Sequence, residues 1–442
     1  MAEIAPLTPL RYDLSRLSGG LASVVAPPYD VISPDERAAL AARDPHNVVR
    51  LILPEGDGDA KYGHAAKLLD TWTRERILVR DDEPAFYRYD QTFSPPGGAG
   101  PKRTRRGFLG LVRLVPFSER IVLPHERTLS GPKEDRLKLF RATHTNLSPG
   151  FMLYRDPRGE LDAALATGAL LAEWTTADGV QHALAKVSKK DAISAVVRGV
   201  ASSSLLIADG HHRYETALRY AEEQTQAHAE SALERGRHRY FMVFLTNGDD
   251  PSLVVFPTHR HVHALAHFSF DELVEKAKPT FHAVALHAGC SAEDMLRELE
   301  KAASTHGRAH FVACAADGRA ALLGLRKDAD LAAHPTVSSL HPALRATDVG
   351  LLHSGILEHL LGITKEAQAA KTNLWYPQDA RAALADVRSG KGQCLFLMNA
   401  TPVADVRSVA EAGEVMPQKS TFFYPKVLTG LAIHTLEVDR AV

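Results

Sequence analysis

The sequence predicts an α/β (α+β mixed) fold, with a mixed-sheet core covered by helices, an inserted α+β unit and a C-terminal strand-helix region. Short apolar runs alternate with segments of helical periodicity along the 442 residues, which is typical of sheets packed against helices. No segment of roughly 20 to 50 residues repeats, which excludes solenoids and propellers. A hydrophobic fraction of 45% allows two or three domains, each with its own core.

The first 265 residues are predicted to form the core domain. Alternating or continuous apolar runs predict strands, and apolar residues at helical spacing predict helices. A Pro-Pro turn interrupts the first strand, and Ser33 is the expected cap of the first helix. Strands are expected over 24–32, 47–54, 85–93 and 105–115, with a last pair over 239–247 and 253–262, and helices over 33–44 and 61–76.

Two further regions follow the core. Residues 266–335 read as helix, strand, helix, strand, strand, which predicts a small α+β subdomain. Residues 336–442 begin with a helix over 348–363, alternate strand and helix, and end on a strand. This last region is expected to pack back on the core.

The segment LLIADGHHRYETAL carries the most specific pattern in the core. Leu205–Ala208 is an apolar run too short for a helix, which predicts the end of a buried strand, and Asp209-Gly210 then interrupts it. Apolar residues return at helical spacing from Tyr214 onward, so a helix should begin near His211. Asp209 is the expected N-cap, and Gly210 permits close approach of a ligand or of a second chain.

An anion site is the first interpretation of this segment. A helix N-terminus offers unpaired N–H groups and partial positive charge, and His211, His212 and Arg213 add donors beside it. Phosphate fits this set best, because a guanidinium can hold two of its oxygens. A structural cap is the second interpretation and a metal site the third, since the i+4 partners of the two histidines are Glu215 and Thr216.

The segment LPHERTLSGPKEDR is also dense in reactive residues. Glu126 is a candidate general base, while HERTL lacks the second histidine of a zinc protease motif. A solvated helix with ion pairs is an equal alternative for its second half. A further segment, THRH, is expected to end a strand. The additional candidate residues are His125, Thr128, Lys133, Arg136, His259 and Arg260.

Near the C-terminus, GEVMPQKST has the glycine and Lys-Ser spacing of a phosphate-binding loop. Gln418 replaces the second glycine, a helix is predicted where a strand must precede, and FFYP cannot open a helix. The loop is therefore rejected. Lys419, Ser420, Thr421 and Lys426 remain a lesser rim for an anion.

Charge and cysteine content restrict the class of protein. A formal net charge of -1 gives no global field for nucleic acid or an anionic membrane. Three widely spaced cysteines form neither a CxxC pair nor a disulfide framework. The N-terminus resembles no signal peptide, and no stretch approaches membrane-spanning length. We therefore expect a cytoplasmic protein that acts on small molecules, without nucleic-acid or membrane partners, alone or as a homodimer.

The motifs APPYDVIS, PHNVVRLILP, LPHERTLSGPKEDR, ADGHHRYETAL, FPTHR and MPQKSTFFYPK occur in this order. Together they resemble the bacterial domain-of-unknown-function family ten-fifteen over nearly the whole chain. The DGHHR element is similar to the phosphate-binding turn of the ParB/sulfiredoxin superfamily, which includes partition proteins, sulfiredoxins and free serine kinases. His211 stands where sulfiredoxins carry their reactive cysteine, and no basic helix-turn-helix accompanies it, so the resemblance favours the free serine kinases.

The resemblance implies phosphoryl transfer to free L-serine from ADP, ATP or pyrophosphate, with Mg²⁺ expected. A phosphoserine phosphatase and a nucleotide-binding regulatory module without turnover are the alternatives. By this resemblance the residues of the DGHHR turn hold the donor phosphates. Phosphoryl transfer also needs a carboxylate that orients the attacking hydroxyl, and we assign Glu126 as this general base, with Asp209 as its rival. His211 is expected to contact phosphate or to move a proton. The remaining expected contacts are Lys133 and Arg136 to phosphate, and His125, Thr128, His259 and Arg260 to the substrate; metal ligands stay unassigned.

Overall fold

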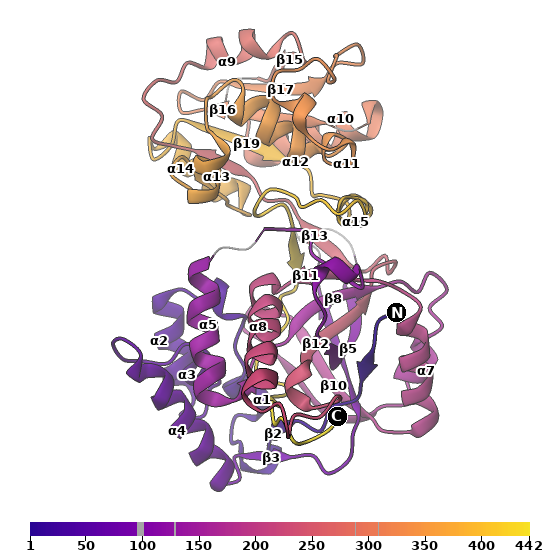
Figure 1. The fold of residues 1–442 in the computed structure, drawn as a ribbon. Helices are drawn as coiled ribbons and strands as arrows, with labels where there is room; N and C mark the ends of the chain where they lie inside the picture. Colours follow the sequence, from indigo (N-terminus) through magenta and orange to yellow (C-terminus); the bar gives the residue numbers. More distant parts are fainter. Residues whose placement is uncertain (95–100, 128–129, 288, 308) are drawn as a thin grey trace. The chain divides into compact units, whose positions relative to one another are not determined.

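The computed structural model of the chain describes residues 1–94, 101–127, 130–287, 289–307 and 309–442. Two compact units divide it. Unit 1 comprises residues 1–124, 128–254 and 425–442, and unit 2 comprises residues 125–127 and 255–424. Unit 2 is thus inserted in the chain of unit 1. Each unit has its own main sheet (Figure 1).

Unit 1 is built on a mixed sheet, which in the described part of the chain has nine strands in the order β6-β11-β8-β12-β5-β4-β10-β9, with β1 paired to β5. The pairs β6-β11 and β8-β12 are parallel and the others antiparallel. The strands are β1 (Ile4–Ala5), β4 (Phe86–Phe93), β5 (Arg103–Arg113), β6 (Val122–Leu123), β8 (Gly150–Tyr154), β9 (Ala169–Thr175), β10 (Gln181–Val187), β11 (Leu205–Asp209) and β12 (Tyr240–Asn247).

Helices cover this sheet, and two short strand pairs complete the unit. The pairs are β2 (Leu10–Tyr12) with β3 (Leu78–Arg80) and β7 (Thr145–Asn146) with β21 (His434–Thr435). The helices are α1 (Gly20–Val24), α2 (Pro34–Arg43), α3 (Val49–Ile52), α4 (Ala60–Arg74), α5 (Ser130–Thr143), α6 (Asp162–Leu165), α7 (Lys190–Ala201) and α8 (His211–Ala227). Helix α5 packs against both α4 and α8.

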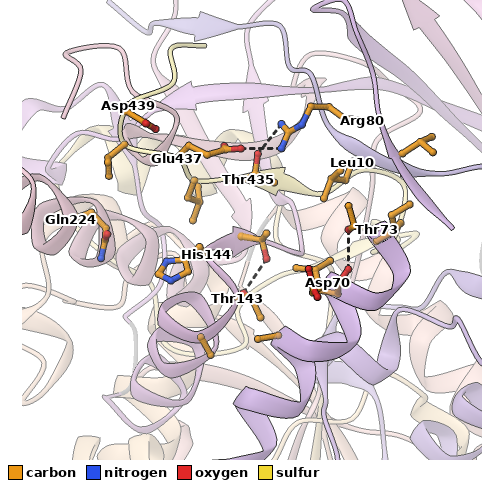
Figure 2. Close-up of a pocket in the computed structure, with 18 of the residues that line it drawn as sticks. Leu10, Asp70, Thr73, Arg80, Thr143, His144, Gln224, Thr435, Glu437 and Asp439 are labelled. Carbon is orange, nitrogen blue, oxygen red and sulfur yellow. Dashed lines mark hydrogen bonds and ion pairs between the residues drawn. The ribbon is translucent and has the colours of Figure 1, made fainter. Parts of the chain in front are cut away.

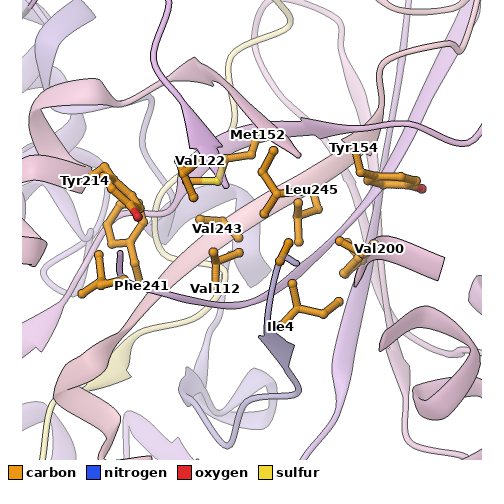
Figure 3. Close-up of a cluster of buried hydrophobic side chains, with 14 of the residues drawn as sticks. Ile4, Val112, Val122, Met152, Tyr154, Val200, Tyr214, Phe241, Val243 and Leu245 are labelled. Carbon is orange, nitrogen blue, oxygen red and sulfur yellow. The ribbon is translucent and has the colours of Figure 1, made fainter. Parts of the chain in front are cut away.

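The core of unit 1 lies between the sheet and helices α7 and α8. Met152, Val243 and Leu245 point from the central strands into one apolar cluster, where they meet Val200 of α7 and Tyr214 of α8 (Figure 3). Strand β12 is buried from Tyr240 to Thr246, which explains its continuous apolar run, because a strand covered on both faces shows no alternation. This packing fixes α8, and with it the start of the helix, against β11.

Unit 2 is built on an antiparallel sheet, of six strands in the described residues, ordered β15-β17-β16-β19-β14-β18. Its core packs α10 and α14 on the sheet through residues such as Met295, Leu384 and Leu397. The sheet strands are β14 (Arg260–Val262), β15 (Phe281–Ala285), β16 (His310–Ala315), β17 (Ala320–Leu325), β18 (Leu374–Trp375) and β19 (Cys394–Met398). The helices are α9 (Phe270–Ala277), α10 (Ala292–His306), α11 (Pro342–Arg345), α12 (Asp348–Leu351), the π-helix η7 (Leu352–Glu358), α13 (Lys365–Ala370), α14 (Ala380–Arg388) and α15 (Val403–Glu411).

The mixed α/β class is confirmed, while the compact units divide the chain at other positions than residues 265 and 335. The six-stranded sheet takes β14 from the expected core, three strands from region 266–335 and two from region 336–442. Hydrogen bonds between strands therefore join, in one sheet, segments that the turn residues of the sequence had assigned to three separate regions. Within the described residues, no helix combines the length and the apolar character needed to cross a membrane.

Two of the expected strands near the N-terminus are wrong. Residues 47–54 contain the buried helix α3, and residues 24–32 contain the end of α1 and a 3-10 turn at Tyr29–Val31. A short apolar run does not distinguish a buried strand from a buried helix. Asn47 favours the helix, because its Oδ1 accepts a hydrogen bond from the backbone N of Val49 at 3.0 Å, a contact that stabilises the start of a helix. The helix capped by Ser33 is confirmed as α2.

A second difference concerns the expected pair of strands over 239–262. Strand β12 pairs with β5 and β8 instead of with the segment that follows it. That segment, LVVFPTHRHV, forms two short strands, β13 (Val254–Phe256) and β14, because Pro257 interrupts it.

Candidate functional site: a cationic turn at the start of a helix

The DGHHR segment forms the expected strand, turn and helix. Strand β11 runs buried between β6 and β8 to Asp209, Gly210 turns the chain, and α8 begins at His211. Gly210 has φ of 94°, in the left-handed region, which residues with a Cβ adopt only at a cost. The glycine is therefore required by the backbone of the turn.

Asp209 does not cap the helix, contrary to our expectation. The start of α8 has no side-chain cap, because the carboxylate of Asp209 is engaged elsewhere. Its Oδ2 lies 2.8 Å from Nζ of Lys426, and its Oδ1 lies 3.3 Å from Nη2 of Arg213. Burial alone would raise the pKa of Asp209, but Lys426, Arg213 and His211 hold this pKa well below its usual value. Asp209 is therefore a carboxylate that stays ionised among cations.

Two residues that the sequence analysis did not single out hold Lys426 in place. Nη2 of Arg105, on β5, donates to the carbonyl of Pro425 at 2.6 Å. Gln91, on β4, donates through Nε2 to the carbonyl of Lys426 at 2.9 Å and accepts from Arg105. Both side chains are fully buried. Strands β4 and β5 thus fix the backbone that carries Lys426 to Asp209.

Arg105 also adds charge beneath the turn. Its guanidinium lies 4.7 Å from the ring centroid of Phe151 and 5.4 Å from that of Phe244. Its Nε and Nη1 are buried without a hydrogen-bond partner among the described residues. Burial lowers the pKa of Arg105 to about 9, against the attraction of Tyr89 and Asp209, so the side chain is still cationic near neutral pH. Three cations, Arg105, Arg213 and Lys426, therefore act on one carboxylate.

Arg213 is more deeply buried than a side chain at an open cleft. It is 5% exposed, and its Nη1 donates to the carbonyl of Pro149. The cavity that it lines with Tyr29 and Arg136 measures about 20 Å³, which is room for about one water molecule. The guanidinium thus ties the turn to the loop before β8, and we interpret Arg213 as a positioning residue.

The other predicted phosphate ligands of unit 1 lie on α5 and α8. His211 is buried and His212 is half-buried at the start of α8. Nζ of Lys133 lies 3.0 Å from Oε2 of Glu215. Arg136 donates to Asp135 through Nε at 2.9 Å and to the carbonyl of Ile52 at 2.6 Å. Lys133 thus pairs with a residue of α8, and the buried Arg136 pairs with its neighbour in the chain, so these contacts differ from ion pairs within one solvated helix.

The remaining candidates belong to unit 2. Oε1 of Glu126 accepts a hydrogen bond from the backbone N of Ser420 at 3.1 Å. The backbone of Glu126 also forms an isolated parallel β-bridge with Met416. His125 is buried, with Nε2 2.9 Å from Oγ1 of Thr421. Loop MPQKST therefore holds the Glu126 segment within this unit. Thr128 lies outside the described residues.

Arg260 begins strand β14 and His259 directly precedes it, so the THRH segment leads into a strand instead of ending one, because Pro257 interrupts the preceding run. Both side chains are 1% exposed. Burial, helped by Arg260, lowers the pKa of His259 to about 4, so this imidazole is neutral. These two residues are part of the interior of unit 2.

A large groove in unit 1 contains none of the predicted site residues. It has a volume of about 870 Å³ and is lined by residues of α4, α5, α8 and the segment 435–439. His144 and Gln224 line it, and Arg80 donates to Thr435 and Glu437 in one part of its wall (Figure 2). Gln224 is near the end of α8, about 20 Å along the helix from His211. This groove is therefore separate from the turn.

Replacing Gly210 with alanine is expected to destabilise the protein through the turn. The left-handed backbone costs a Cβ residue about 1–2 kcal/mol, and the new Cβ would stand 3.0 Å from Cζ of Arg213. Gly179→Ala is the matched control, because Gly179 has a φ of 80° with no atom near its Cβ position. Urea unfolding should show the larger loss for Gly210→Ala. Equal losses would contradict the close contact with Arg213.

Fold and site together define a mixed α/β protein in which a glycine turn at a helix start gathers cations around a carboxylate. The chain belongs to the family described as Protein of unknown function (DUF1015), whose model matches residues 4–349. No curated protein matches it significantly.

Several solved structures are similar to the chain. A conserved hypothetical protein from Pyrococcus furiosus is 13% identical, with 73% of this chain and 94% of that chain covered and a TM-score of 0.34. A mutant free serine kinase in complex with ADP is 13% identical, with 79% and 99% covered and a TM-score of 0.37. A free serine kinase in complex with AMP is 12% identical, with 73% and 91% covered and a TM-score of 0.36.

Proposed function

We propose that the protein is a phosphotransferase that acts on a small hydroxyl-bearing metabolite, with free L-serine as acceptor and ADP, ATP or pyrophosphate as donor. The cationic turn supports this proposal. Backbone N–H groups at the start of α8, with Lys426 and Arg213 around Asp209, favour a multiply charged anion. Phosphoryl transfer depends mainly on such positioning and charge.

In the proposed reaction the serine hydroxyl oxygen attacks the terminal phosphorus of the donor. The new O–P bond forms as the bond from that phosphorus to the bridging oxygen breaks. AMP, ADP or phosphate leaves with the bonding electrons, and the hydroxyl proton passes to a general base. The cations at the turn stabilise charge on the transferred group and on the leaving oxygen.

Glu126 keeps the role of general base in this proposal, and Asp209 does not. A base that works near neutral pH needs a pKa close to that pH. Lys426 and Arg213 lower the pKa of Asp209 against the effect of burial, which makes it a weaker base than an ordinary carboxylate. We therefore assign Asp209 to holding Lys426 and Arg213 at the turn. His211 adds positive charge there and is the candidate for proton transfer within unit 1.

The described residues do not fit a dedicated Mg²⁺ site. They contain no group of three His, Cys, Asp or Glu side chains placed to hold a metal ion. Magnesium in phosphoryl-transfer sites commonly binds the donor phosphates and one or two carboxylates. The metal ligands among the described residues therefore stay unassigned.

One assay separates this proposal from its alternatives. The purified protein is incubated with L-serine and, in turn, ADP, ATP or pyrophosphate, with Mg²⁺ added, and phosphoserine is measured by mass spectrometry. A parallel incubation supplies phosphoserine and water alone. A transferase forms phosphoserine from at least one donor, whereas a phosphatase only consumes it. A regulatory module does neither, and that result would refute the proposal.

The donor is expected to be recognised mainly through its phosphates. Lys426→Met removes a charge-assisted contact of about 1.5–3 kcal/mol, so pyrophosphate affinity should fall roughly tenfold or more. Lys138→Met is the control, because Lys138 pairs with Asp59 on the surface. Calorimetric titration should also show pyrophosphate or ADP binding at least as tightly as ATP. Tight ATP binding with undetectable pyrophosphate binding would contradict this.

A further inference from the structure

Unit 2 contains a cavity of its own. It has a volume of about 330 Å³, near the lower end of the range for small-molecule sites and equal to about ten water molecules. Apolar side chains, including Leu340, Leu344 and Met416, form part of its wall. Charged residues also line it, notably Glu358, Lys365 and Arg127. The combination is typical of a pocket for a small polar metabolite with an apolar part.

The wall of this cavity includes a rare element. The π-helix η7 runs from Leu352 to Glu358 between α12 and α13, and His353, Ser354 and Glu358 line the cavity from it. A π-helix is less favourable than an α-helix and is frequently found at functional sites. Here the π-helix brings His353 to the same cavity as Ser354, one position further along, and Glu358, five positions further along.

A buried hydrogen-bond network makes this wall rigid. Nε of Arg260 donates to Nε2 of His353 at 2.9 Å, so Nδ1 of His353 carries the proton and donates to Oε1 of Gln368 at 2.6 Å. Nε2 of Gln368 donates in turn to the carbonyl of Ile363 at 2.8 Å. Burial, with help from Arg260, lowers the pKa of His353 to about 3, so the ring is neutral. The cavity is therefore preformed.

The polar groups of the cavity are of opposite charge and close together. Oε2 of Glu358 is buried without a hydrogen-bond partner among the described residues, and a buried carboxylate oxygen of this kind is costly unless a donor reaches it. Nζ of Lys365 lies 4.0 Å away, beyond hydrogen-bond distance, and its side chain is 58% exposed. Arg127 is also exposed. The Glu358 side chain as a whole is 23% exposed, so a ligand ammonium would pair with the accessible part of its carboxylate, and a ligand carboxylate would suit Lys365 and Arg127.

We propose that this cavity of unit 2 binds a free α-amino acid with an apolar side chain, and that this site is separate from the phosphate-binding turn. The ammonium and carboxylate of an α-amino acid share one carbon, which matches charges as close as those of Glu358 and Lys365. The apolar side chain packs against Leu340, Leu344 and Met416. The inference does not depend on phosphoryl transfer, because it concerns binding without a donor.

Calorimetric titration of the full chain with L-leucine, in the absence of any phosphoryl donor, tests this site. L-leucine should bind, while 4-methylpentanoate, which lacks the ammonium, and 3-methylbutylamine, which lacks the carboxylate, should bind at least roughly tenfold more weakly. Glu358→Gln should weaken L-leucine by a similar factor. Glu366→Gln is the matched control, since Glu366 is exposed on α13 and does not line the cavity.

A second variant guards against misfolding of Glu358→Gln. Lys365→Met changes an exposed side chain and should weaken L-leucine but leave 3-methylbutylamine unchanged. Absence of L-leucine binding, or equal binding by the wild-type protein and Glu358→Gln, would overturn the proposal. Tighter binding of L-serine than of L-leucine, with the same dependence on Glu358, would overturn the apolar specificity.

Discussion

Replacing Glu126 with glutamine is expected to lower phosphoserine formation by roughly 10²- to 10⁴-fold, the usual contribution of a general base. Glutamine keeps the side-chain oxygen that accepts from the backbone N of Ser420, so the loop that holds residue 126 should stay in place. The loss should fall on kcat, because the base acts in the chemical step. Steady-state kinetics with saturating L-serine and donor measure it.

The control for this variant is Glu366→Gln, which makes the same chemical change on the surface of unit 2 and should leave kcat unchanged. Circular dichroism and donor binding should match the wild-type protein in both variants. A Glu126→Gln protein with near-normal kcat would remove Glu126 from the chemistry. The role of Glu126 would then be structural, through the hydrogen bond that it accepts from the backbone N of Ser420.

Arg213→Lys is expected to lower activity by roughly 10²-fold or more. Lysine keeps the positive charge but cannot reach both the carbonyl of Pro149 and the carboxylate of Asp209, as the guanidinium does. The turn should therefore lose its fixed position relative to β8. Because Arg213 is buried, the thermal unfolding midpoint should also fall, and activity must be measured well below it.

Arg219→Lys is the matched control for Arg213→Lys. Arg219 lies on the same helix, with 56% of its side chain exposed, and pairs with Glu223 and Glu134. Exposed pairs of this kind contribute about 0–1 kcal/mol, so neither activity nor stability should change appreciably. Normal turnover by Arg213→Lys, together with a lowered unfolding midpoint, would show that the arginine serves stability alone.

The local geometry of the candidate site could be predicted from the sequence. An apolar run followed by Asp209-Gly210 and then by helical periodicity determines a strand, a turn and a helix over neighbouring residues, and the structure has these elements. Such a prediction succeeds because hydrogen bonds and backbone angles over this stretch depend on residues close in the chain. The same holds for α2, which Ser33 caps, and for the helix and strand order of residues 266–335.

The partners of Asp209 could not be predicted in this way. Lys426 lies 217 positions further along the chain, and no local pattern links the two residues. Arg105 gave no signal either, because a basic strand residue in KRTRR is ordinarily solvated, whereas here it is fully buried between two phenylalanine rings. The burial of Arg213 likewise depends on Pro149, which a distant loop supplies.

The insertion of unit 2 has a consequence for the order in which the chain can fold. Unit 1 needs segment 425–442 to supply Lys426 and strand β21, and this segment leaves the ribosome after all of unit 2. During synthesis the DGHHR turn therefore exists for a time without its lysine, and Asp209 then lacks one of the three cations that act on it. Closing the long loop between Asp209 and Lys426 costs little more entropy than closing a shorter one. The loop cannot close, however, until residues 425–442 have been synthesised. A released chain that ends at residue 424 should consequently contain a folded unit 2 and an incomplete unit 1.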